Sequence, residues 1–271
     1  MTVETATGVG GGHEPAPDAA SNAVPALRLR GVGRRFGGVQ AVQDVDLDVR
    51  LGERRAILGP NGAGKTTLFN LIAGDFPPTA GTIEVLGTDV TALPPRSRPS
   101  LGLSRSYQKS RLFGGLTVLD NLYIALRGKR GGRLRWYRGR ADAELLDRAR
   151  HAADQVALGG VIDVPVGSLS HGEQRQLEVA MAQVTDPKVI MLDEPASGLS
   201  RGERERLTEL LHAIPREVTL VLIEHDMDVA LNVAEYVTMM HDGRKIVEGT
   251  PAEIRANELV HDLYLGSGHY E

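Results

Sequence analysis

The chain contains no cysteine among its 271 residues, so disulfide bonds and thiolate metal sites are excluded. It has no run of about 18 consecutive apolar residues, the length that a membrane-spanning helix needs, so we do not expect it to cross a membrane by itself. It also lacks a positive surplus, because 31 Lys and Arg residues stand against 35 Asp and Glu residues and the net charge is −4. Nothing in this balance favours nucleic acid as a partner.

The first 25 residues lack both the basic start and the apolar block of a signal peptide. They are rich in Gly, Ala, Pro and Thr, which favours a disordered tail of a cytoplasmic protein. The whole chain is 41% hydrophobic, which is enough to bury one sizeable core, or one core and a subdomain. We therefore expect a disordered tail over residues 1–25, followed by a folded region.

The segment "GPNGAGKTT" (59–67) follows an apolar strand, "RRAIL" (54–58), and precedes a helical pattern that ends at Gly74. A glycine loop in this position can point successive N–H groups into one concavity beside the positive end of a helix, which makes a cradle for phosphate. Its spacing matches the P-loop, in which Lys65 reaches the β and γ phosphates and the Thr66 hydroxyl binds Mg²⁺. The expected nucleotide-binding residues are Gly59, Asn61, Gly62, Ala63, Gly64, Lys65, Thr66 and Thr67. The alternative is a mobile glycine turn that binds nothing.

Patterns of apolar residues predict the elements around this loop. Residues 44–49 alternate between apolar residues and aspartate, which predicts a strand with one solvated face, and 82–87 is another short strand. The runs 188–194 and 219–225 are almost wholly apolar and fit central parallel strands covered on both faces. Further on, two strands are expected around Asp242-Gly243, and "TPAE" (250–253) opens a terminal helix.

The middle of the chain has a different periodicity. Helical spacing places Leu145, Ala149, Ala152, Ala153 and Val156 on one face, and Leu177, Ala180, Met181 and Val184 on another. The fold class predicted is therefore α/β, with an antiparallel β region near the start of the core and an inserted α-helical subdomain.

Two adjacent carboxylates follow the apolar run "KVIML". Asp193 ends a strand where a P-loop protein needs a carboxylate to hold Mg²⁺, and Glu194 is then positioned to polarise an attacking water as general base. Such a pair can also be only a helix cap. His225 ends the run "LVLIEH"; a lone histidine is more often structural than catalytic.

The segment "LSHGEQRQLEVA" (169–180), located before "MLDEP" and after the P-loop, resembles the signature motif of ATP-binding cassette (ABC) ATPases. The resemblance implies an ABC ATPase domain over 26–266, with a P-loop NTPase core, an antiparallel β subdomain, a helical subdomain at about 107–184 and a C-terminal tail over 267–271. It also implies ATP hydrolysis, with ATP and Mg²⁺ bound.

The resemblance assigns roles to single residues. Phe36 matches the aromatic residue that stacks on adenine, although a hydrophobic staple is the alternative. Gln108 matches the residue that contacts Mg²⁺ and the membrane partner, and His225 matches the switch histidine at the γ-phosphate. The implied catalytic residues are Glu194, His225 and Gln108, and the implied metal ligands are Thr66, Gln108 and Asp193.

The signature residues Ser170, His171, Gly172 and Glu173 are expected to contact ATP held by the P-loop of the opposite protomer. His171 replaces the first of the two central glycines of the family motif, and Glu173 replaces its glutamine. In "SGLS" (197–200) the family often has Asp or Asn at the last position, where Ser200 can still cap a helix. These departures from the family motif concern communication between the two ATP sites of the expected dimer.

The segments "RSYQKSRLFGGLTVLDNL", "EHDMDVA" and "GTPAEIRANELVHDLYLG" are similar to the ATPases of importers for branched-chain amino acids, urea or short amides. That branch implies location at the cytoplasmic face of the membrane, permease subunits, an extracytoplasmic solute-binding protein and a second ATPase protomer, identical or related. Lipopolysaccharide-export ATPases resemble it too. A soluble ABC protein of assembly or repair is the alternative from another class, and a small-molecule kinase leaves "LSHGEQ" unexplained.

Residues 127–140 carry seven basic residues and no acidic one, with Trp136 and Tyr137 among them. Contact with anionic lipid or a permease loop is one interpretation. We favour the other, a solvated glycine-rich loop.

Overall fold

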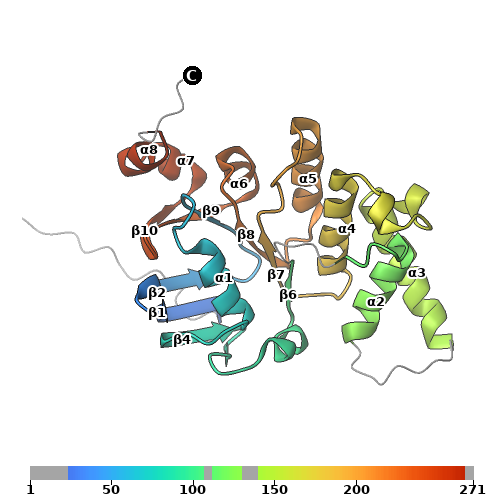
Figure 1. Cartoon of the computed structure of the whole chain (residues 1–271), viewed down its shortest axis with the longest axis horizontal. Helices are drawn as coiled ribbons and strands as arrows, with labels where there is room; N and C mark the ends of the chain where they lie inside the picture. The colour runs from blue at the N-terminus through green and yellow to red at the C-terminus, as the bar shows by residue number, and fades with distance from the viewer. Residues whose placement is uncertain (1–23, 107–111, 130–139, 266–271) are drawn as a thin grey trace, which may run out of the picture.

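The computed structural model describes residues 24–106, 112–129 and 140–265 (Figure 1). The described strands are β1 (Leu27–Phe36), β2 (Val39–Val49), β3 (Arg54–Leu58), β4 (Ala80–Val85), β5 (Thr88–Asp89), β6 (Leu103–Arg105), β7 (Val189–Asp193), β8 (Thr219–Ile223), β9 (Tyr236–His241) and β10 (Arg244–Gly249). The described α-helices are α1 (Lys65–Ala73), α2 (Val118–Lys129), α3 (Arg140–Gln155), α4 (His171–Gln183), α5 (Arg201–Ala213), α6 (Met227–Val233), α7 (Pro251–Arg255) and α8 (Glu258–Leu265). Short 3-10 helices span Pro95–Ser97, Pro99–Leu101, Gly159–Val161 and Val166–Ser168.

The strands form two sheets. Four antiparallel strands lie in the order β2-β1-β4-β5, and six strands lie in the order β10-β9-β3-β8-β7-β6. In the larger sheet β9, β3, β8, β7 and β6 run parallel and β10 is antiparallel to β9. This confirms the predicted α/β class with an antiparallel β region near the start.

Helix α1 lies between the two sheets, and α4, α5 and α6 cover the opposite face of the larger one. Alternation along β7 determines this layering: Val189 and Met191 pack with Leu68 and Ile72 of α1. Ile190 and Leu192 of the same strand instead join the cluster that contains residues of α4, α5 and α6. Both faces of β7 are therefore buried, as the almost wholly apolar run 188–194 predicts.

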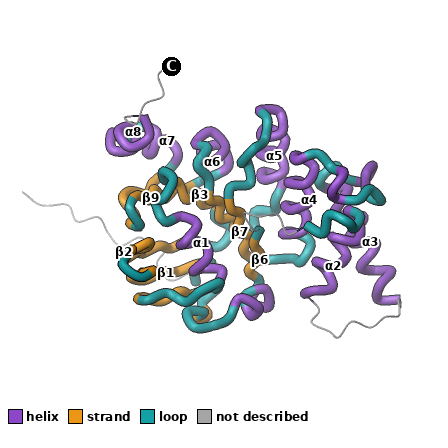
Figure 2. Tube along the Cα trace, viewed as in Figure 1, coloured by secondary structure: helices purple, strands orange, loops and turns teal. Residues whose placement is uncertain are grey.

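Helices α2, α3 and α4 gather at one end of the molecule, beyond β6 (Figure 2). Their shared core contains the two faces predicted from helical spacing, including Leu145, Ala149 and Leu177. Figure 1 shows β8, β7 and β6 between α1 and α4. None of the helices in the described ranges has both the length and the apolar character that a membrane crossing requires.

Strand β2 departs from its prediction. It begins at Val39 rather than Asp44, and its burial alternates regularly only from Val45 onward. Asp44 has a φ of +47°, and the pairing with β1 shifts on either side of it. This irregularity interrupts the period of two, so the first half of the strand carries no simple pattern.

Candidate nucleotide site

The phosphate loop joins β3 to α1, as its sequence predicts. Gly64 immediately precedes α1 and has a φ of +93°. A Cβ atom on Gly64 would lie 2.4 Å from the carbonyl oxygen of Ala41, so only glycine fits this position. The loop borders a groove of about 590 Å³ whose lining includes Val39, Gln40, Ala41, Asn61, Gly62, Ala63, Gly64, Lys65, Thr66, Thr67, Glu194 and Gly243. Gly59, the remaining predicted loop residue, accepts a hydrogen bond from the Lys65 ammonium group through its carbonyl oxygen.

Lys65 spans the inside of this loop. Its Nζ donates to the carbonyl oxygens of Gly59, at 2.7 Å, and Pro60, at 3.0 Å, and the residue is only 5% exposed. Burial lowers the pKa of Lys65, while the nearby carboxylates Glu194 and Asp193 act against that shift. A buried cation in a glycine loop at the start of a helix is suited to bind the phosphates of a nucleotide.

Asp193 ends β7 and is 2% exposed. Its Oδ1 atom is buried and has no hydrogen-bond partner within the described part of the chain. Burial, with a further contribution from Glu194, raises the pKa of Asp193 to about 6. An unpaired buried carboxylate oxygen is costly, and it is the hard oxygen ligand that Mg²⁺ prefers. Thr66 lines the groove and follows Lys65, on which the charge of Asp193 acts, so the hydroxyl and the carboxylate supply oxygen donors that fit a magnesium ion.

Glu194 lies at the turn that follows β7. Its φ is +46°, a conformation rare for a residue with a side chain, and its N–H donates to the Ile223 carbonyl oxygen at 2.8 Å. The turn directs the Glu194 carboxylate to the groove, where Oε1 lies 3.7 Å from Nδ1 of His225. Three predicted residues, Asp193, Glu194 and His225, are thus brought together at the ends of β7 and β8.

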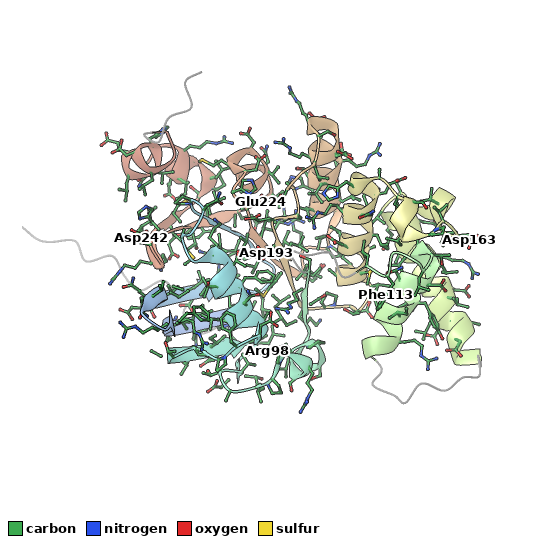
Figure 3. The ribbon with its side chains drawn as sticks, in the orientation of Figure 1. Arg98, Phe113, Asp163, Asp193, Glu224 and Asp242 are labelled. Atoms are coloured by element: carbon green, nitrogen blue, oxygen red, sulfur yellow. The ribbon has the colours of Figure 1, made fainter. Side chains whose placement is uncertain are left out.

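Glu224 is a functional candidate that the sequence analysis missed. It is 0% exposed, and its two oxygens accept from the N–H of Ala196 at 2.8 Å and of His225 at 3.2 Å. Figure 3 shows it with Asp193 in the middle of the molecule. Burial raises the pKa of Glu224. The Glu224 carboxylate links the turn after Glu194 to His225. Its position directly after the apolar run 220–223 is the sequence feature that could have indicated it.

The predicted signature residues lie at the start of α4, which begins at His171. Ser170 caps the helix, and Glu173 accepts from the Ser170 N–H at 2.8 Å, so a reciprocal capping box is present. The Gly172 N–H donates to Oε1 of Glu203 at 3.2 Å. His171 lies with Nε2 3.4 Å from the Ser197 carbonyl oxygen. The donors expected to meet a phosphate are therefore engaged by carboxylates of the same chain.

The signature region and the phosphate loop are separate within one chain. A cavity of about 360 Å³ is lined by Ser170, Gly172, Glu173 and Glu203, and it shares no lining residue with the phosphate groove among the residues described. Ser200 caps α5 as predicted. Gln108 lies outside the described residues, as do 130–139 of the basic segment.

Phe36 lies at the end of β1 and pairs in the sheet with Val39, which lines the groove. The residue is 44% exposed. It contacts Phe76 edge to face, with ring centroids 5.3 Å apart. Phe36 is thus next to the groove through its strand partner Val39.

Comparison with known proteins agrees with this arrangement. A sequence profile described as "ABC transporter" matches residues 42–197, and one described as "Branched-chain amino acid ATP-binding cassette transporter" matches residues 244–270. The chain is 38% identical over 251 residues to the high-affinity branched-chain amino acid transport ATP-binding protein LivG of Salmonella typhimurium, covering 89% of this chain and 98% of the relative. The resemblance inferred from the signature motif is confirmed.

Solved structures give the same result for the fold. The ADP conformation of MJ1267, an ATP-binding cassette of an ABC transporter, aligns with a TM-score of 0.79 at 27% identity, over 89% of this chain and 99% of that one. A dimeric, post-hydrolysis structure of the ATP-binding cassette MJ0796, bound to ADP and Pi, aligns with a TM-score of 0.71 at 25% identity, over 83% of this chain and 98% of that one.

Proposed function

The chain belongs to the ABC transporter family and is an ABC-type ATPase, and from that premise we propose that it powers the uptake of branched-chain amino acids. The observation that carries the ATPase role is that Lys65 and Glu194 line one groove, while the charge of Asp193 acts on Lys65 and His225 lies 3.7 Å from Glu194. The match of residues 244–270 to the branched-chain amino acid profile supports the solute.

In the reaction, the loop N–H groups and Lys65 hold the phosphates of ATP. Asp193, Thr66 and Gln108 would hold Mg²⁺, which neutralises charge on the phosphates when bound. Glu194 takes a proton from the water that attacks the terminal phosphate, and ADP and phosphate are the products. In this proposal His225, whose Nδ1 lies 3.7 Å from Oε1 of Glu194, orients that carboxylate and contacts the terminal phosphate.

The separation of the signature region from the phosphate groove supports a dimer in which each protomer completes the other's site. In this arrangement Ser170, His171, Gly172 and Glu173 face the ATP of the partner, which is either a second copy or a related ATPase. The dimeric MJ0796 structure is a precedent at 25% identity. Closure on ATP and opening after hydrolysis would then drive permease subunits at the cytoplasmic face of the membrane.

The uptake role is favoured over the two alternatives. The LivG relative is a transport protein for branched-chain amino acids, and it matches over nearly its whole length. This match favours import over export of lipopolysaccharide and over a soluble role in assembly or repair.

The test is reconstitution of the ATPase with its permease subunits and solute-binding protein in vesicles. Leucine, isoleucine or valine should enter only with ATP present, and the solute-loaded binding protein should stimulate hydrolysis. Urea and short amides serve as competing solutes. Stimulation by urea or an amide but by no branched-chain amino acid would exclude the proposed solute and keep the importer, whereas movement of a lipid out of the inner leaflet would exclude import.

A further inference from the structure

An arginine near the rim of the groove packs against the ring expected to meet the base. Cζ of Arg34 lies over the ring of Phe36, 4.6 Å from its centroid, and over the ring of Phe76, 4.9 Å from its centroid. The two rings are nearly perpendicular, at 84°. The guanidinium group therefore contacts both rings, at distances typical of cation–π interactions.

The backbone keeps this group in place. Arg34 and Phe36 are two residues apart at the end of β1, where the pairing with β2 is irregular, and their side chains are in contact. Nη1 of Arg34 donates to the Pro77 carbonyl oxygen at 2.6 Å, in the segment that joins α1 to β4. The arginine thus links the end of β1 to the segment carrying Phe76, and it fixes the plane of the Phe36 ring between them.

Phe36 stays partly exposed despite these contacts. Although Arg34 covers one face and Phe76 contacts the ring, Phe36 is 44% exposed, and its strand partner Val39 lines the groove. A cation draws on the π electrons of the ring that it covers, so the opposite face becomes a better partner for an electron-rich purine. The arrangement combines a cation held against the ring with a residue that is still partly exposed.

We propose that Arg34 is a positioning residue for base recognition: it holds Phe36 in place and strengthens its stacking on the adenine ring of ATP. This inference rests on the proposed function, because it requires that Phe36 receives the base. It separates two parts of the affinity for ATP, one from the phosphates at Lys65 and one from the base at Phe36.

The experiment compares two ligands, ATP and inorganic tripolyphosphate, which has no base. Their dissociation constants are measured by calorimetry for the wild type and for Arg34→Met, which keeps a long apolar side chain but lacks the cation. Affinity for ATP should fall about 3- to 10-fold, while affinity for tripolyphosphate should change less than about 2-fold. Arg35→Met is the matched control, because it removes the same charge from an exposed neighbour on β1 and should leave both constants near wild type.

Phe36→Ala tests the route of the effect. It should weaken ATP binding and leave tripolyphosphate binding unchanged, and adding Arg34→Met to it should cause no further loss. Equal weakening of both ligands by Arg34→Met, or unchanged ATP affinity in a variant that melts like the wild type, would overturn the role of Arg34. Failure of the wild type to bind either ligand would instead overturn the proposed nucleotide site, so the two failures are distinguishable.

Discussion

The carboxylate of Glu203 accepts a hydrogen bond from the backbone N–H of Gly172, although the two residues are 31 positions apart in the chain. A Cβ on Gly172 would lie 2.6 Å from the same oxygen, so glycine at this position permits the contact. Hydrogen bonds from Ser200 lower the pKa of Glu203, which keeps it charged at neutral pH. In the proposed dimer, the Glu203 carboxylate thus accepts from the Gly172 N–H, and the phosphate of ATP held by the partner protomer needs the same donor.

Removing this charge should therefore favour the dimer. Glu203→Gln keeps the capping box of α5, since glutamine serves at that position as glutamate does. In a background that binds but does not cleave ATP, we expect half-maximal dimer formation at about 3- to 10-fold lower protein concentration, because like charges in contact oppose association. Glu205→Gln on the same helix is the control, since Glu205 is exposed and pairs with Arg201. A dimer no tighter than in the control would contradict the competition.

The raised pKa of Asp193 makes a prediction about pH and stability. The group titrates at 3.8 in the unfolded chain and at about 6 in the folded one, so the folded state binds the proton more tightly. The cost of the buried charge is absent below pH 3.8, grows as the pH rises, and is complete above pH 6. This cost amounts to about 3 kcal/mol of folding free energy at most. Removing the Asp193 charge gains less than that, because the buried Lys65 ammonium group then loses one of its anionic neighbours.

Asp193→Asn should accordingly raise the melting temperature of the protein at pH 7.5 without nucleotide or Mg²⁺, by several degrees, and by much less at pH 4.5. The same variant should lose Mg²⁺-dependent ATP binding. Thermal unfolding at the two pH values checks the first part and calorimetry checks the second. No rise in melting temperature at pH 7.5, or a fall, would mean that burial does not raise the pKa of Asp193 in the folded protein.

The buried position of Glu224 predicts an effect on turnover rather than on binding. Its two oxygens hold the N–H groups of Ala196 and His225, and Glu224→Gln replaces one of these acceptors by an NH₂ donor. The turn after Glu194 and the histidine should then lose their fixed relation, so kcat should fall about 10-fold while KM for ATP changes less than about 3-fold. Steady-state kinetics measure both constants, with Glu209→Gln, at an exposed residue, as the control. A kcat for Glu224→Gln equal to that of the control would contradict this role of Glu224.

The elements that sequence analysis predicted best are those with continuous local patterns. The apolar runs of β7 and β8 indicated buried parallel strands, and the glycine spacing of the P-loop indicated its turn, because in both cases neighbouring residues carry the signal. Contacts between distant residues were not predictable in this way. Glu203 meets Gly172, and Arg34 meets Phe76, only because packing of the sheets and helices brings separate segments together.

Glu194 allows a test of the whole mechanism. Glu194→Gln keeps the shape of the side chain but removes the base, so hydrolysis should fall by about 10²-fold or more. ATP should still bind, because Lys65 and Asp193 are unchanged, and loss of the Glu194 charge removes one cause of the raised pKa of Asp193. Uncleaved ATP should then keep bridging the phosphate loop of one protomer and the Ser170 region of the other. The variant should accumulate as a dimer with ATP and not with ADP.

Size-exclusion chromatography with light scattering distinguishes these states. Adding Ser170→Arg should abolish the ATP-dependent dimer by crowding the start of α4, whereas Ser100→Arg, at an exposed serine on a 3-10 helix, should leave it intact. If the chain dimerises only with a related ATPase, the experiment must include that protein. A monomer contradicts the proposed dimer only when both proteins are present. Normal hydrolysis by Glu194→Gln in the assembled complex would show that another group accepts the proton, and the 3.7 Å approach of His225 makes that histidine the first residue to replace next.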